Sequence, residues 1–523
     1  MPRLFGLETE YGIQVDGVRD MDVVVESMEL IRSYLREEFV ARWDYALENP
    51  RRDARGFEVA ELLNDRDETE HLQRDRQRQI PLSELKSDLI LPNGARLYND
   101  HTHPEYSTPE CLRLRDLVAA DRAGERILRE CARRRTASRG DGGAVRLYKN
   151  NTDFEDHSYG CHENYLFSRQ VPFQRVIEGL LPFLVTRQVY AGAGKVGVEA
   201  ERAAAQDVYQ LAQRSDFFEV VASVDTMTRR PLINTRDEPH ADASRYRRLH
   251  LIVGDANMTE HSTALKVGAT ALVLELLDLD LAPAPRLADP VGAVKAISRD
   301  QSRTWAVSLE GGRLASALEI QRAYLDRAVG LAAGRDEETD WVLAAWEGAL
   351  EALGRDPLEL LGACDWVTKK WLLDAFAEAE GLDWADPEHR HWLQSQDLEY
   401  HNIEPEEGLF LLLEGAADTP VRRLASEGEV HRALSRAPEG TRARVRGRFL
   451  EKFGPAVRAA NWDSIDYWVD GRLATLDLKG CVDPGRAAYL AEVVEGAASV
   501  AALAARLAAD SRTCSPKSEL TLT

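Results

Sequence analysis

The segment LFGLETEYG, residues 4–12, places two carboxylates inside an apolar stretch with the composition of a β-strand. Successive side chains of a strand point to opposite faces, so Glu8 and Glu10 share one face while Leu7 and Thr9 share the other. The commoner explanation of such a pattern is an edge strand whose two acids lie in water. The alternative is a carboxylate pair that binds a divalent cation, and the rest of the chain must distinguish the two.

Length and charge limit the classes of protein that the chain can represent. At 523 residues it is long enough for one large domain and a second, small one. Its 66 basic and 88 acidic residues give a net charge of −22, which argues against nucleic-acid and membrane partners because both bind cationic surfaces. Six scattered cysteines, no export-signal pattern and no long apolar run predict a soluble, cytoplasmic protein.

The order of the expected elements indicates an α+β fold with a mainly antiparallel sheet. Strand-like segments recur in the first half of the chain, whereas residues 258–380 have helical periodicity. Residues 49–87 are mostly charged or polar, which is typical of a surface loop or an active-site lid. We expect a catalytic domain over residues 1–430, which includes this polar loop, and a small C-terminal domain over residues 431–523.

The segment ARLYNDHTHPEYSTPEC, residues 95–111, carries the strongest chemical signal. Arg96, Tyr98 and Asp100 occupy alternate positions of an expected strand and project from one face. A guanidinium suits a phosphate, and a carboxylate can act as a base, a nucleophile or a metal ligand. An arginine paired with a neighbouring aspartate explains the triplet alone equally well. Together with Glu8 and Glu10, however, these acids require a neutralising partner, and Mg²⁺ prefers carboxylates and phosphates.

A second concentration of polar residues lies in INTRDEPHADASRYRRLH, residues 233–250, which contains Arg236 and a run of further arginines. The segment SYGCHENYL, residues 158–166, adds His162 and Asn164 on one strand face. The apolar stretch LHLIVGDAN, residues 249–257, is typical of a buried strand that holds the end of the polar loop. We therefore expect a nucleotide phosphate site made from arginines, carboxylates and Mg²⁺.

One glycine motif in the chain is misleading. GAGKVG, residues 192–197, matches the G-x-G-x-x-G pattern of dinucleotide-binding folds but has no βαβ unit around it, so we interpret it as a glycine-rich turn. The sequence also lacks the G-x-x-x-x-G-K-[ST] loop that cradles phosphates. Any use of ATP would therefore involve a sheet lined with carboxylates.

Several long motifs resemble the Pup ligase and depupylase family, whose members are related to glutamine synthetase and other carboxylate–amine ligases. The resemblance rests on ETEYG (8–12), NGARLYNDHTHPEYSTPEC (93–111), YKNNTD (148–153), SYGCHENYL, PFLVTRQ (182–188) and INTRDEPHADASRYRRLH followed by GDANM (254–258). It covers nearly the whole chain. It implies a concave, glutamine-synthetase-like antiparallel sheet that binds ATP and Mg²⁺, is backed by helices, and has a small C-terminal domain beside it.

Matched residue by residue, the resemblance assigns three groups of site residues. The catalytic aspartate of the family corresponds to Asp100. Metal-binding positions correspond to Glu8, Tyr98 and Glu105, with Glu10 and His162 as further contributors. ATP-contacting positions correspond to Arg96, Thr108 and Trp462, and we add Arg236 from the polar loop as a phosphate-binding residue.

The family has two branches with different reactions. The ligase phosphorylates the C-terminal glutamate of the small protein Pup and joins it to a lysine, whereas the depupylase hydrolyses that isopeptide bond and deamidates a C-terminal glutamine of Pup. RWDYALENPRRDARGF (42–57) with the polar insertion behind it, and AQRSDFFEV (212–220), resemble the depupylase, while SYGCHENYL, NNTD and VGDANM are closer to the ligase. We expect an ATP- and Mg²⁺-dependent depupylase and Pup deamidase that acts on Pup and pupylated proteins in the proteasome pathway, with a Pup–protein ligase as the alternative.

Overall fold

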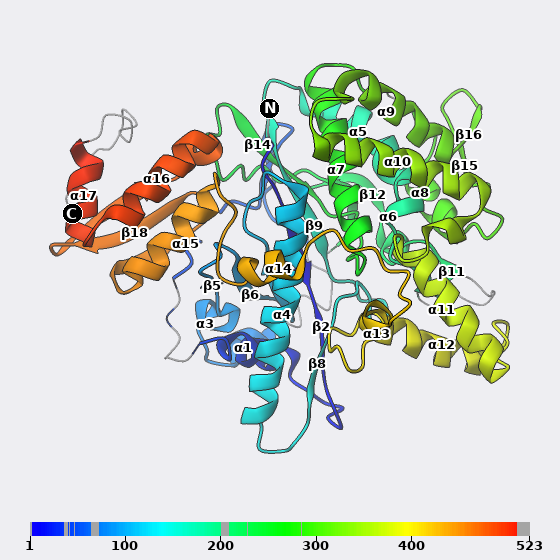
Figure 1. Cartoon of the computed structure of the whole chain (residues 1–523), viewed down its shortest axis with the longest axis horizontal. Coiled ribbons are helices and arrows are strands. Elements are labelled where there is room, and N and C mark those ends of the chain that lie inside the picture. Colours follow the sequence, from blue (N-terminus) through cyan, green and yellow to red (C-terminus); the bar gives the residue numbers. More distant parts are fainter. Residues whose placement is uncertain are drawn as a thin grey trace.

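A six-stranded antiparallel sheet lies at the centre of the computed structural model, which describes residues 3–35, 40, 42–45, 48–63, 73–199, 209–226, 228–283 and 285–509 (Figure 1). The strand order is β14-β9-β1-β7-β6-β5. Their bounds are β1 Phe5–Glu10, β5 Leu89–Ile90, β6 Arg96–Asp100, β7 His103–Ser107, β9 Cys161–Ser168 and β14 Tyr246–Leu251. Because β1 lies between β9 and β7, the explanation of its two acids as an exposed edge strand is wrong.

Strand register brings distant acidic and imidazole groups to one face of this sheet. Glu8 lies opposite His162 of β9, and Glu10 lies opposite Glu105 of β7. Glu105 in turn lies opposite Tyr98 of β6. Directly opposed residues of antiparallel strands point to the same side, so these side chains share what we call the front face, the face that carries Glu8 and Glu10.

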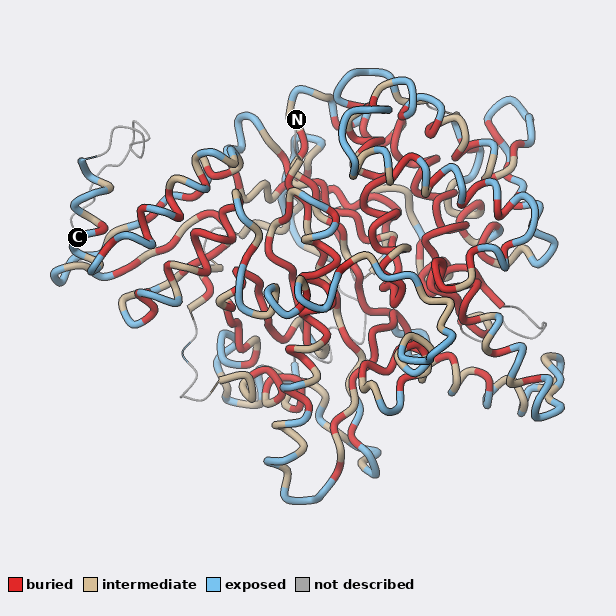
Figure 2. The backbone as a smooth tube through the Cα atoms, in the orientation of Figure 1, coloured by how far each residue is buried: buried red, intermediate tan, exposed pale blue. Residues whose placement is uncertain are grey.

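The rear face of the sheet packs against helices. Phe5 and Leu7, which alternate with the acids of β1, belong to the main hydrophobic core together with Leu117 of α4 (Leu114–Ser138) and Leu265 of α7 (Glu260–Asp278). In Figure 2 the central strands and the helices behind them form a continuous buried region. Period-two alternation in β1 thus places apolar groups in the core and carboxylates in front.

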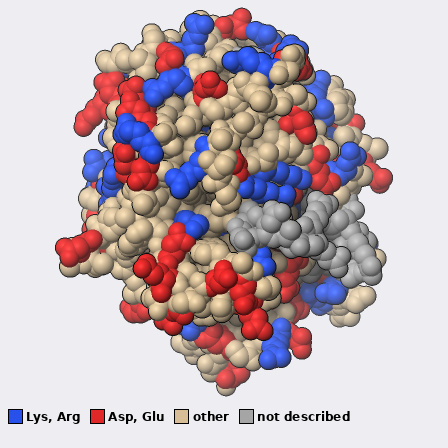
Figure 3. Space-filling view, turned by 90° about the vertical axis from the view of Figure 1, so that its right-hand side faces the viewer, with Lys and Arg blue, Asp and Glu red and all other residues tan. Residues whose placement is uncertain are grey.

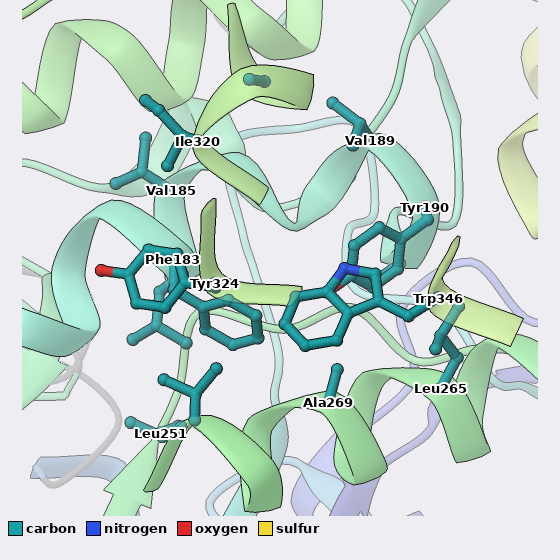
Figure 4. Packing of buried hydrophobic residues seen from close by; sticks show 14 of the residues in the cluster. Phe183, Val185, Val189, Tyr190, Leu251, Leu265, Ala269, Ile320, Tyr324 and Trp346 are labelled. Atoms are coloured by element: carbon teal, nitrogen blue, oxygen red, sulfur yellow. The ribbon is translucent and has the colours of Figure 1, made fainter. Parts of the chain in front are cut away.

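Further helices extend this core away from the sheet. They are α5 Phe173–Thr186, α6 Gln188–Ala191, α8 Pro290–Arg299, α9 Ala317–Ala332, α10 Glu337–Arg355, α11 Asp365–Glu380 and α12 Pro387–Tyr400. Phe183 and Trp346 pack edge to face with ring centroids 5.7 Å apart, and Tyr190 and Tyr324 lie beside them (Figure 4). Such aromatic contacts stabilise beyond the area that they bury. The predicted helical region over residues 258–380 is confirmed.

The remaining elements are short. Paired strands are β2 Gly12–Val15 with β8 Val145–Tyr148, β3 Arg52–Asp53 with β4 Phe57–Glu58, β10 Lys195–Val196 with β11 Tyr209–Gln210, β12 Val220–Ser223 with β13 Pro231–Asn234, and β15 Ala306–Ser308 with β16 Leu314–Ser316. Short or peripheral helices are α1 Val23–Arg32, α3 Leu82–Lys86, α13 Leu409–Gly415 and α14 Glu427–Ala433. Within the described part of the chain, no helix has both the length and the apolar character required to cross a membrane.

The C-terminal segment has a hydrophobic cluster of its own. It contains α15 Arg442–Phe453, β17 Val457–Ala460, β18 Ser464–Val469, β19 Arg472–Asp477, α16 Pro484–Gly496 and α17 Val500–Ala509, drawn orange to red in Figure 1. Phe449 and Tyr467 lie at the centre of this cluster with ring centroids 5.1 Å apart. A domain boundary near residue 430 stays a prediction.

The GAGKVG segment is only in part the turn that was predicted, because its Lys195 and Val196 form β10. Residues 192–194 connect α6 to β10, and β10 pairs with β11 in an antiparallel two-stranded sheet, so no βαβ unit surrounds the segment. Gly194 has a φ of +74°, and a Cβ atom on Gly192 would lie 2.0 Å from the carbonyl oxygen of Leu211. The glycines therefore allow close backbone packing.

The polar insertion contacts the loop that carries Arg236. The hairpin β3–β4 lies on this loop, where the Ala54 amide donates to the Thr235 carbonyl (2.7 Å) and the Thr235 hydroxyl donates to Asp53 (2.7 Å). The part of the predicted loop that covers residues 64–72 lies outside the described residues. The described part thus reaches the neighbourhood of the polar front face.

Candidate nucleotide and metal site

Three carboxylates from three neighbouring strands meet on the front face. One oxygen each from Glu10 (β1), Asp100 (β6) and Glu105 (β7) lies within 4.8 Å of the others. Glu105 also accepts hydrogen bonds from the hydroxyls of Tyr98 (2.8 Å) and Ser107 (3.1 Å). We call Glu10, Asp100 and Glu105 the Asp100 cluster.

The charges of the Asp100 cluster are mutually unfavourable. Burial, together with Glu8, Asp100 and Glu10, raises the pKa of Glu105 well above its usual value. Burial also opposes the charge on Asp100, but His101, Lys86 and Arg96 outweigh it and lower the pKa of Asp100. Asp100 is therefore ionised at neutral pH, and its crowded neighbours provide the environment that a divalent cation would stabilise.

A second group lies beside it on the same face. Glu8 (β1), His162 (β9) and His250 (β14) form the Glu8 cluster, in which the Glu8 carboxylate is 3.4 Å from His162 Nδ1 and 3.5 Å from His250 Nε2. Asn164 donates to Glu8 at 2.9 Å and Arg248 at 3.3 Å. Burial, with help from Arg248, lowers the pKa of His250 to about 3, so its imidazole is neutral and can offer a lone pair.

The two clusters fit metal ions of different character. Among the described residues, neither ring nitrogen of His250 makes a hydrogen bond of good geometry, although Nε2 lies 3.5 Å from Glu8, so the buried imidazole could ligate a further group. The all-oxygen Asp100 cluster matches the preference of Mg²⁺. The Glu8 cluster offers two imidazoles, which suit divalent transition metals such as Zn²⁺ or Fe²⁺ better than Mg²⁺.

A pocket adjoins the Glu8 cluster. It has an empty volume of about 560 Å³, and Glu8, Thr108, His240, Arg248 and Trp462 are among its lining residues. Thr108 accepts a hydrogen bond from the Leu7 amide (3.0 Å), which fixes this side chain against β1. Because the pocket combines an aromatic wall with cationic and carboxylate groups at its metal-binding end, it suits a nucleotide.

Two of the arginines assigned from the sequence lie outside the lining of this pocket. Arg96 donates from Nε to Asp88 at 2.6 Å, and its guanidinium carbon is 3.9 Å from the ring centroid of Trp43 and 3.7 Å from that of Tyr98. Arg236 donates to the Val224 carbonyl at 2.9 Å. Both arginines are thus partly engaged, and phosphate contacts from them stay predictions.

Two residues that the sequence analysis left without an individual role lie at the site. His250 and Arg248, within the RYRRLH segment, occupy alternate positions of β14 and face Glu8. Alternation predicts that these two residues share a face, but not that this face meets Glu8. Arg247, by contrast, is buried beside Phe173 and faces away from the site.

The distribution of charge on the molecular surface does not by itself point to a functional site. On the face drawn in Figure 3, acidic and basic side chains are interspersed over the visible surface. The front face differs because its charged groups are partly buried and directed toward one another. The buried clusters, and not the mixed-sign surface, therefore make the front face the candidate functional site.

Comparison with known proteins assigns a family to these features. The family model described as "Pup-ligase protein" matches residues 3–466. The depupylase of Acidothermus cellulolyticus is 42% identical over 520 residues, which span 97% of this chain and 99% of that protein. The Pup–protein ligase of Nakamurella multipartita is 45% identical over 393 residues, which span 73% of this chain and 83% of that protein.

Solved structures of ligases share the fold. A complex of Pup with its ligase PafA has a TM-score of 0.76 at 32% identity, covering 94% of this chain and 92% of that one. The Pup ligase PafA in complex with ADP has a TM-score of 0.70 at 35% identity, covering 84% of this chain and 97% of that one. The expected mixed α+β architecture with an antiparallel sheet is confirmed.

Proposed function

Because this chain belongs to the Pup-ligase family and a depupylase matches it over nearly its full length, we propose that it is a Pup deamidase and depupylase. It would hydrolyse the isopeptide bond between the C-terminal glutamate of Pup and a substrate lysine, and deamidate a C-terminal glutamine of Pup. The front face would form the concave, glutamine-synthetase-like cradle for ATP and metal ions. The observation that carries the chemistry is the ionised Asp100 beside Glu10 and Glu105.

The pocket beside Glu8 would hold ATP as a required cofactor. Trp462 offers a stacking surface for the base, while Arg248 and the neighbouring Arg236 supply positive charge for phosphates. The Glu8 and Asp100 clusters would each hold a divalent cation, which would supply Lewis-acid stabilisation of developing negative charge. Tyr98 would act through its hydrogen bond to Glu105, and Arg96 through its position against Tyr98.

Asp100 has two chemically distinct roles open to it. As a general base it would accept a proton from water, whose oxygen attacks the amide carbonyl at the terminal residue of Pup; the C–N bond then breaks and the proton passes to the departing ammonia or lysine amine. As a nucleophile its carboxylate would attack that carbonyl and expel the ammonia or lysine amine, which takes up a proton from water, and water would then hydrolyse the resulting anhydride and release Asp100. In either case the lowered pKa keeps Asp100 in the reactive, ionised form.

One experiment tests this function against its alternative. Purified protein would be incubated with ATP, a divalent metal and Pup that ends in glutamine, and the Pup mass would be measured. We expect the mass increase that accompanies conversion of the terminal amide to an acid. A chain that leaves this Pup unchanged but joins Pup ending in glutamate to a lysine-bearing protein would instead be a Pup–protein ligase, and the proposal would be wrong.

A further inference from the structure

Glu110 links the sheet to the aromatic wall of the pocket. It follows β7 and lines the pocket that also contains Trp462. Its carboxylate accepts from Arg442 Nε at 2.5 Å and from Arg446 Nη2 at 2.7 Å. Two arginines of α15 therefore converge on one acid at the end of the sheet strand.

Arg446 carries this contact on to Trp462. The side chain is fully buried, and its Nη1 donates to the Trp462 carbonyl at 3.0 Å. Its guanidinium carbon lies 4.9 Å from the Trp462 ring centroid, within the range of a cation–π contact. The guanidinium that binds Glu110 thus also holds both the backbone and the ring of Trp462.

Close backbone packing keeps α15 in this position. A Cβ atom on Gly447 would lie 2.2 Å from the Pro92 carbonyl oxygen, and one on Gly94 would lie 2.6 Å from that of Ala443. Arg446 Nη2 also donates to the Gly94 carbonyl at 2.6 Å. Since the helix is seated without space for a side chain at the contact, the arginines have little freedom to follow a displaced partner.

Two neighbouring arginines stabilise the negative charge of Glu110. Burial disfavours the ionised form, but Arg446 and Arg442 outweigh it and lower the pKa of Glu110 to about 2. Removing that charge would leave two buried guanidinium groups without their shared counter-ion, which is costly in a site of low polarity. The expected response is a shift of Arg446 and, with it, of Trp462.

We propose that Glu110 is a positioning residue for nucleotide binding: through Arg446 it holds Trp462 against the base. This inference rests on the proposed nucleotide pocket. Glu110 would not touch the reacting atoms, so its loss should weaken nucleotide binding and leave the rate at saturating ATP nearly unchanged. It should also leave the affinity for inorganic tripolyphosphate, which has no base, unchanged.

A double-mutant cycle tests the proposal. ADP affinity would be measured by calorimetry on the wild type, Glu110→Gln, Trp462→Ala and the double variant. Stacking on an aromatic side chain is worth roughly tenfold or more in affinity, so we expect each single variant to lose about tenfold and the double variant to lose no more than Trp462→Ala alone. Glu26→Gln is the matched control, because Glu26 is also a buried carboxylate shared by two arginines, Arg135 and Arg139, and does not line the pocket.

The possible outcomes distinguish a failure of the positioning role of Glu110 from a failure of the proposed nucleotide-dependent function. Unchanged ADP affinity in Glu110→Gln, additive losses in the double variant, or an equal loss of tripolyphosphate affinity would overturn the positioning role alone. A wild type that binds no nucleotide would overturn the proposed function as well. If Glu110→Gln does not fold, Glu110→Asp, which keeps the charge but shortens the reach to Arg446, provides the same cycle with a smaller expected loss.

Discussion

The Glu8 cluster and the Asp100 cluster share a strand and a sheet face but differ in chemistry. Glu8 and Glu10 are two positions apart on β1, yet the first meets two imidazoles and the second meets two carboxylates. The Glu8 cluster adjoins the pocket with Trp462, whereas the Asp100 cluster lies toward β6. We propose on this basis a division of labour, in which the Glu8 cluster would hold the nucleotide and the Asp100 cluster would perform the hydrolysis.

Substitution of the aspartate should give the largest effect. Asp100→Asn keeps the size of the side chain but removes its basicity and nucleophilicity, so we expect deamidation and isopeptide hydrolysis to fall by roughly a thousandfold or more. Nucleotide affinity should stay within about twofold of the wild type, because the Glu8 cluster is intact. Near-normal turnover would remove Asp100 from the mechanism.

Substitution of Glu8 should act mainly by weakening nucleotide binding. Glu8→Ala removes the only carboxylate of the Glu8 cluster among the described residues, so we expect ADP affinity in the presence of metal to fall by about a hundredfold. Turnover at accessible ATP concentrations should fall in parallel. Calorimetry on Glu8→Ala and Asp100→Asn side by side measures the contrast, and equal nucleotide affinities in the two variants would contradict it.

The pH dependence of stability tests the ion pairs of Glu110 beside the proposed nucleotide pocket. Because the folded-state pKa of Glu110 is lowered to about 2, its ion pairs stabilise the protein above the ordinary carboxylate pKa, and this stabilisation is lost as the pH falls toward 2. The shift corresponds to at most about 3 kcal/mol. Thermal unfolding of wild type and Glu110→Gln should therefore differ most above pH 5 and converge only as the pH falls toward 2, and a constant difference would contradict this origin.

The polar insertion should have the smallest effect. Thr235→Val removes the hydrogen bond to Asp53 that joins the β3–β4 hairpin to the loop of Arg236. We expect turnover to change by only about two- to fivefold, as for a contact that positions a loop, with ADP affinity unaltered. Thr304→Val, at an exposed threonine that also donates to an aspartate, is the control. Equal turnover in the two variants would show that the insertion does not influence the site.

The alternation of residues along the sequence predicted which side chains share a strand face, but not which strands pair with one another. Alternation in residues 4–12 and 95–111 correctly placed Glu8 with Glu10 and Arg96 with Asp100. The family and its depupylase branch were also predicted and agree with the comparisons. The metal-binding residues assigned from the resemblance lie in two clusters, Glu8 with His162 and Glu10 with Glu105, a grouping that the sequence analysis did not specify.

The contacts that the sequence could not predict depend on how distant segments pair and pack. His250 joins Glu8 only because β14 pairs with β9, and no local signal specifies that pairing. Arg96 is held by Asp88 and Trp43, which come from separate segments that tertiary packing brings together. The Glu110–Arg446 contact likewise depends on how α15 docks against the turn at Gly94.

The number of bound cations tests the division of labour most directly. Mn²⁺, a paramagnetic substitute for Mg²⁺, would be counted by electron paramagnetic resonance in protein saturated with ADP, for the wild type, Glu8→Gln and Glu10→Gln. The account predicts two ions per chain in the wild type, one for each cluster, and the loss of a different ion in each variant. A single ion in the wild type, or loss of the same ion in both variants, would contradict it.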